Sequence, residues 1–196
     1  MKKNLLFSLI VSLLLSGCTY SNKGPIAAPT ASVRPVTTEH MLHHSISVKD
    51  IVGIRESARH IGVFKIVTEK EVNAALRKNL QSQGLAAVSQ ETARYTLKVS
   101  FTDISASLRI GGSQPGTAAL KYELIDNKSQ NIVKRGRIQG KGKARGVGDA
   151  SVRTVESARC AVKNALYRLT LELRSNQPVP QSGLLDGGCE FRTTYR

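Results

Sequence analysis

Few residues in this sequence have the types and spacing that catalysis requires. No serine lies in a G-x-S-x-G or S-x-x-K pattern. Cys18 aside, Cys160 is the only cysteine that falls in a predicted helix or strand. No histidine lies near it in sequence to activate its thiol. We therefore expect a protein that is not an enzyme and that carries no cofactor.

Three histidines lie together in the segment HMLHH, at positions His40, His43 and His44. Neutral imidazole is a common metal ligand, so this segment is a candidate metal site. Only Glu39 is available nearby as a further ligand. We favour a solvated linker end and expect no metal.

Cys18 ends a segment that has the features of an export signal. Two lysines precede an almost unbroken apolar run from Leu5 to Leu15, which is too short to cross a hydrocarbon core of about 30 Å. The residues LSGC, 15–18, resemble the bacterial lipobox, in which the cysteine thiol receives a diacylglyceryl group and the signal peptide is cut before it. The pattern predicts a signal peptide over 1–17 and a lipidated Cys18, with an ordinary secretory signal as the alternative.

Several acyl chains on one cysteine anchor a protein stably to a membrane. In bacteria with two membranes, the residue after the lipidated cysteine helps to decide sorting. By resemblance to that rule, Thr19 in place of aspartate predicts the outer membrane, with the body facing the periplasm.

Cys160 and Cys189 remain once Cys18 is lipidated. Disulfides form outside the cytoplasm, and an even pair of cysteines there is more often bridged than free. We expect a Cys160–Cys189 disulfide, and the alternative is a buried Cys160 thiol with a loose tail.

A basic run covers residues 134–145, which contain six lysines and arginines and no acid. Alternate residues of a strand share one face. Five cations therefore fall on one predicted face: Arg135, Arg137, Lys141, Lys143 and Arg145. This face either binds an acidic partner or is a solvated surface that protects an edge strand. Three glycines alternate with the cations, and we interpret the strand as weakened and less suited to core packing than its neighbours.

The formal net charge is +15, and it is +13 without the two lysines of the signal peptide. Such an excess points to an acidic partner. In the cell envelope the candidates are an acidic protein, an anionic glycolipid, lipid headgroups or peptidoglycan carboxylates. We exclude nucleic acid, because no basic motif interleaved with aromatic residues is present.

Hydrophobic periodicity predicts the elements that position these residues. Thr68 and Glu71 form a capping box that begins a helix, and Gly84 ends it. A second helix runs from the N-cap Asp149 to Arg174. Four strands are expected within 44–54, 94–104, 117–125 and 132–146.

The order β-α-β-β-β-α predicts a two-layer α+β domain, an antiparallel sheet of about four strands covered by two helices. The domain is expected over residues 44–174. It follows a flexible, Pro-, Ala-, Ser- and Thr-rich linker over 18–43 and precedes a tail over 175–196.

The lipobox, the linker, the helix ending in LQSQGL and the segment ALKYELIDNKSQNIVKRG resemble the small outer-membrane lipoproteins of the YajG type. The order of elements is also similar to LptE, the lipoprotein partner of the lipopolysaccharide translocon. The resemblance implies a lipid-anchored α+β domain and transfers no activity.

Two functions remain open. The first is a non-catalytic, outer-membrane-anchored lipoprotein that serves as a scaffold or assembly accessory for an envelope complex. The second is a binder of anionic glycolipid or glycan through the basic strand 134–145. Affinity for a glycolipid should fall more steeply with added salt than affinity for a protein.

Overall fold

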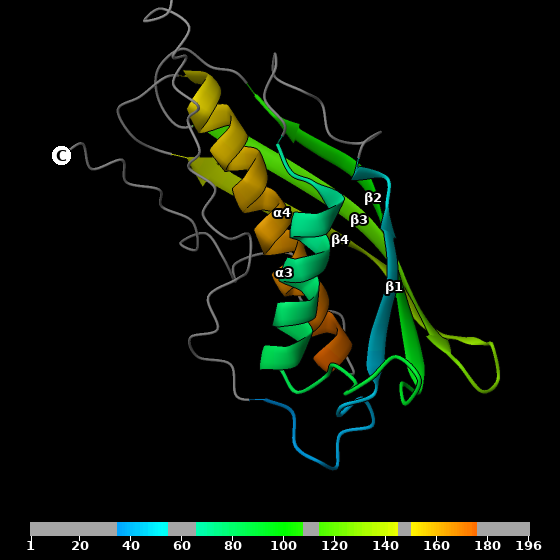
Figure 1. The fold of residues 1–196 in the computed structure, drawn as a ribbon. Coiled ribbons are helices and arrows are strands. Elements are labelled where there is room, and N and C mark those ends of the chain that lie inside the picture. Colours follow the sequence, from blue (N-terminus) through cyan, green and yellow to red (C-terminus); the bar gives the residue numbers. More distant parts are fainter. Residues whose placement is uncertain (1–34, 55–65, 108–113, 145–149, 176–196) are drawn as a thin grey trace, which may run out of the picture.

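The computed structural model describes residues 35–54, 66–107, 114–144 and 150–175. Its elements are β1 (Ile46–Val52), α3 (Glu69–Ser82), β2 (Tyr95–Ala106), β3 (Gln114–Asp126), β4 (Ile132–Ala144) and α4 (Ala150–Arg174). The predicted α+β class and the order β-α-β-β-β-α are confirmed. Both helices lie on one face of the sheet, which gives the predicted two layers (Figure 1).

The sheet has the order β1-β2-β3-β4 and is mixed. The pairs β2–β3 and β3–β4 are antiparallel, whereas β1 and β2 are parallel. The prediction of a wholly antiparallel sheet was wrong for this one pair. Helix α3 crosses over the sheet between β1 and β2, so the chain enters β2 in the same direction as β1.

Helix α3 begins and ends as its sequence predicts. The Thr68 side chain accepts from the Glu71 N–H, and the Glu71 carboxylate accepts from the Thr68 N–H at 2.8 Å. Gly84 has a φ of +69°, the left-handed conformation that glycine adopts at low cost after a helix. The helix buries one face against the domain core, formed by Val72, Ala75, Leu76, Asn79 and Leu80.

The core lies between the helices and the inner face of the sheet. Alternation along β2 and β3 buries Leu97, Val99, Leu120 and Leu124 almost completely. The middle of α4 packs on them through Val162, Ala165, Leu166 and Leu169. None of the described helices combines the length and the apolar character that a membrane crossing requires.

The folded part begins before residue 44. Val36 and Leu42 are buried and belong to the core cluster. The Val36 N–H donates to the Gln83 carbonyl oxygen at 3.0 Å, which ties this segment to the end of α3. Residues 35–43, predicted as part of a linker, therefore pack on the domain.

Candidate functional site on the open face of the sheet

The face of the sheet opposite α3 and α4 is covered by none of the described elements (Figure 1), and we call it the open face. From Arg135 to Lys143, odd-numbered residues of β4 are exposed and Ile138, Gly140 and Gly142 between them are buried. Arg135, Arg137, Lys141 and Lys143 therefore share the open face, as the alternation predicts. Arg145 lies outside the described residues, and binding at any of these positions stays a prediction.

Strand β3 adds a cation and an acid to the open face. Lys121 lies opposite Arg137 in the ladder, and Glu123 lies opposite Arg135. We call Lys121, Arg137, Lys141 and Lys143 the basic face. Like charges directly opposite each other destabilise a strand pair, so a bound acidic group would relieve the Lys121–Arg137 repulsion.

The alternation along β4 alone does not reveal Lys121 or Glu123, because both residues lie on the neighbouring strand β3. The register across the hairpin assigns both residues to the same surface. Glu123 is also opposite Lys98 of β2, so one row across the sheet alternates in charge. The lack of acids in residues 134–145 therefore overstates the charge around Arg135.

A shallow pocket of about 340 Å³ lies across β1, β2 and β3 next to the basic face. Its charged lining residues are Lys98, Lys121, Asp50 and Glu123. The other lining residues are Val52, Val99, Ser100 and Tyr122. The pocket thus offers both signs of charge, and it shares Lys121 with the basic face, whose members are all cations.

Gly140 and Gly142 of β4 lie directly against α4. A Cβ atom on Gly140 would overlap the Ala161 carbonyl oxygen and the Ala165 backbone nitrogen. A Cβ on Gly142 would overlap the Ser157 carbonyl oxygen in the same way. The interpretation of this strand as less suited to core packing was wrong, because glycine lets the backbone of α4 lie directly on it.

Side chains of α4 bond to β4, which is an edge strand. Asn164 Nδ2 donates to the Lys141 carbonyl oxygen at 2.6 Å, and Arg168 donates to the Gln139 carbonyl oxygen at 2.8 Å. These bonds occupy backbone acceptors of the edge strand, which limits pairing with a further strand. The open face therefore offers side chains, not a free strand edge, along this stretch.

Lys134 belongs to the basic run but not to the open face. Its Nζ donates to the carbonyl oxygens of Glu172 and Ser175 at the end of α4, where a cation is favoured. Burial lowers the pKa of Lys134, and the Glu172 carboxylate opposes this shift. The Tyr122 hydroxyl donates to the same carboxylate at 2.6 Å, and burial raises the pKa of Tyr122.

The histidine segment packs on the domain. His40 Nδ1 accepts from the Leu42 N–H, which leaves the proton on Nε2 to donate to the Arg174 carbonyl oxygen at 2.9 Å. His40 is therefore not a solvated linker end. The His43 and His44 rings pack edge-to-face, with 4.1 Å between their centroids. Across residues 35–54, 66–107, 114–144 and 150–175, no three side chains that could ligate a metal gather in one place.

Of the three cysteines, the structure describes one. Cys160 is buried in α4, and a Cβ on Gly142 would lie 2.9 Å from its Cβ. It thus lies against β4. Cys18, Cys189 and the predicted N-cap Asp149 lie outside the described residues.

No protein-family model matches the sequence, and no curated protein matches it. Solved structures show a similar arrangement of elements. A minor lipoprotein from Acinetobacter baumannii is 11% identical, with a TM-score of 0.49 over 69% of this chain and 96% of its own. A protein from Xanthomonas campestris is 15% identical, with a TM-score of 0.48 over 72% and 87%. One from Caulobacter crescentus is also 15% identical, with a TM-score of 0.45 over 69% and 92%. At these identities and scores the likeness concerns the fold and carries no argument about function.

Proposed function

We propose that this chain is a non-catalytic lipoprotein, anchored in the outer membrane through Cys18, that docks an acidic envelope protein on its basic face. The observation that carries the docking is the cross-strand pairing of Lys121 with Arg137 on an exposed surface. Lys141 and Lys143 extend this charge along β4, opposite Thr117 and Pro115. The arrangement supports a scaffold or assembly role.

The shape of the site favours a protein over a glycolipid. Small-molecule sites are concave and enclose most of their ligand. The basic face lies on the side-chain surface of a sheet, and the shallow pocket that it borders at Lys121 also contains the carboxylates of Asp50 and Glu123. Those carboxylates would repel a phosphorylated headgroup, whereas a protein can place its acids over the cations alone.

Arginine and lysine have separate uses on this face. The guanidinium of Arg137 can bind a carboxylate through two parallel hydrogen bonds, which fixes the orientation of the partner. The three lysines act as point charges that favour encounter and are screened by salt. Arg137 is therefore the position where we expect the greatest specificity.

The test reverses two charges on the basic face of the full chain, Arg137→Glu with Lys141→Glu. Its control is Lys70→Glu with Lys78→Glu, which changes the net charge equally at two exposed positions on α3. Solubilised outer-membrane proteins should copurify with the wild type and the control but not with the reversed face. Circular dichroism of each variant verifies folding.

Equal copurification by both variants would contradict the docking. If the wild type instead retains glycolipid phosphate, and the charge-reversed variant does not, then the basic face binds glycolipid and not a protein. Retention in either case should decrease as salt is raised, because exposed charges about a Debye length apart are screened.

The proposals of a lipid anchor at Cys18 and of a YajG-type lipoprotein rest on the sequence alone. We also propose the Cys160–Cys189 disulfide, which would join the tail to α4 beside Gly142. With 28 residues between the cysteines, loop-closure entropy corresponds to roughly 3–4 kcal/mol. Mass mapping of unreduced protein should show the two peptides joined, and two alkylatable thiols in fresh protein would rule the bridge out.

A further inference from the structure

Three chain segments lie at the end of the molecule where β1 and β2 begin, toward the bottom of Figure 1, from which the β3–β4 turn extends to the right. They are residues 35–45, residues 83–94 and the β3–β4 turn at 127–131. Backbone bonds tie the first two together, with the His44 N–H donating to Gly84 at 2.9 Å and the Ser45 N–H donating to Leu85 at 3.1 Å.

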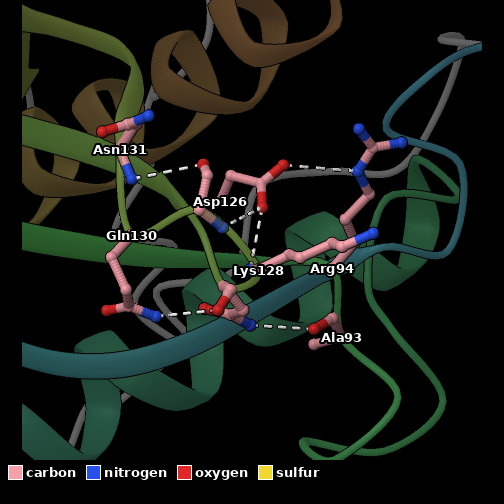
Figure 2. Close-up of polar contacts among 8 residues, drawn as sticks. Ala93, Arg94, Asp126, Lys128, Gln130 and Asn131 are labelled. Carbon is pink, nitrogen blue, oxygen red and sulfur yellow. Dashed lines mark hydrogen bonds and ion pairs between the residues drawn. The ribbon is translucent and has the colours of Figure 1, made fainter.

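The β3–β4 turn is fixed to the same end by polar contacts, which Figure 2 shows. The Asn127 side chain donates to the Ala93 carbonyl oxygen and its N–H donates to the Arg94 carbonyl oxygen, both at 2.8 Å. Asp126 accepts from the Lys128 N–H at 2.8 Å and lies 3.5 Å from Arg94 Nε. The three segments therefore form one hydrogen-bonded surface.

Exposed apolar side chains concentrate on this surface. Among the described residues, five large hydrophobic side chains are exposed, and four of them lie in or next to the three segments: Met41, Val88, Ile132 and Val133. Val88 is 92% exposed. We call these four residues the apolar end. The three segments also carry four exposed charged residues of balanced sign: Glu39, Glu91, Arg94 and Lys128.

The chain enters the domain at this same end. Pro35 precedes Val36, whose N–H bonds to Gln83 at the end of α3. The 17 residues from 18 to 34 span at most about 60 Å when fully extended. A lipid on Cys18 therefore keeps the apolar end close to the bilayer, which raises its effective concentration there.

We propose that the apolar end rests in the interface of the membrane to which the lipidated Cys18 attaches the chain. The inference rests on the proposed lipid anchor. Exposed aliphatic side chains at one end of a domain gain free energy by entering the acyl boundary. The balanced charge of the segments means that this contact needs no anionic lipid and is insensitive to salt.

This orientation also serves the docking surface. Lys141 lies nine residues along β4 from Ile132, which corresponds to about 30 Å of strand. With the apolar end in the membrane, the basic face extends away from the bilayer, where an envelope protein can reach it.

The chain has no tryptophan, so a single introduced tryptophan reports its own environment. The probes are Val88→Trp and Ile132→Trp in lipidated full-length protein, on phosphatidylcholine vesicles with brominated acyl chains. The control is Thr117→Trp, an exposed residue of β3 opposite Lys141. We expect a blue shift and strong quenching for the two probes and neither change for the control. Added salt should leave the quenching unchanged.

Absence of quenching at both probe positions in protein that floats with the vesicles would overturn the orientation and leave the docking proposal standing. Equal quenching of all three variants would overturn it too. Protein that fails to float would contradict the lipid anchor and this inference with it. Because all three positions are exposed, folding should survive, and circular dichroism verifies it.

Discussion

Gly140 and Gly142 decide how closely α4 approaches the sheet. Their missing Cβ atoms leave room for backbone atoms of Ala161, Ala165 and Ser157. Helix residues with small side chains meet strand residues with none, so two backbones pack almost directly. Three cations of the basic face, Arg137, Lys141 and Lys143, therefore lie on a strand whose opposite face packs closely on α4.

We predict that Gly140→Ala destabilises the fold by about 1–3 kcal/mol, because the added methyl group overpacks the contact with the α4 backbone. Gly136→Ala is the matched control. Its Cβ would lie 2.8 Å from the Tyr122 ring and 2.9 Å from the Glu172 carboxylate, contacts with side chains that are less close than the approach to the α4 backbone at Gly140, so we expect a smaller loss. Urea unfolding measures both, and a loss at Gly136 as large as that at Gly140 would contradict this account.

Helices α3 and α4 are joined by an ion pair at the start of α3. Arg159 is buried, and its guanidinium donates to the Ile66 carbonyl oxygen at 3.0 Å and to Glu71 at 3.4 Å. Glu71 also completes the capping box with Thr68. One carboxylate therefore stabilises both the beginning of a helix and the packing between helices.

The Glu71 carboxylate predicts an acid-sensitive contribution to stability. Partial burial raises its pKa, but hydrogen bonds from Thr68 and the charge of Arg159 outweigh this effect, so the pKa lies below its ordinary 4.5. The stabilisation is therefore present above the unfolded-state pKa and is lost as pH falls through the folded-state pKa. Glu71→Gln should cost roughly 1 kcal/mol at neutral pH, after allowance for solvent screening.

Urea unfolding of wild type and Glu71→Gln at several pH values measures this contribution. The difference between the two proteins should shrink as pH falls below 4.5. A difference that is constant across this range would show that the carboxylate charge contributes nothing.

Local patterns predicted the elements well, because capping and side-chain alternation act within a few residues. The capping box at Thr68, the buried face of β2 and the exposure of the odd-numbered residues of β4 all follow from such patterns. Relations between elements were harder to predict. The parallel pairing of β1 with β2 and the position of Glu123 opposite Arg135 depend on topology and register, which no single segment contains.

The same limit explains the incorrect interpretation of the glycines. Along one strand they indicate weakness, and only the position of α4 shows that they are contact residues. His40 is similar, since its carbonyl acceptor at Arg174 lies 134 residues further along the chain.

For the whole molecule, the proposed anchor predicts where the protein is found. Cys18→Ser removes the thiol that would receive the lipid, so the body should appear in the soluble periplasmic fraction or as an uncleaved precursor. Cell fractionation with immunoblotting measures this. A Cys18→Ser protein that matures normally and stays with the outer membrane would contradict the anchor.

Binding of an acidic envelope protein by the basic face is the proposal on which the scaffold role depends. Its most direct test is a photo-crosslinking amino acid at Gln139, which is exposed between Arg137 and Lys141. The control position is Ala74, exposed on α3. In intact cells we predict one discrete protein adduct from position 139 and none from position 74. That adduct should disappear when Arg137→Glu and Lys141→Glu are added. An adduct pattern that is the same at both positions, or that survives the charge reversal, would contradict binding at the basic face.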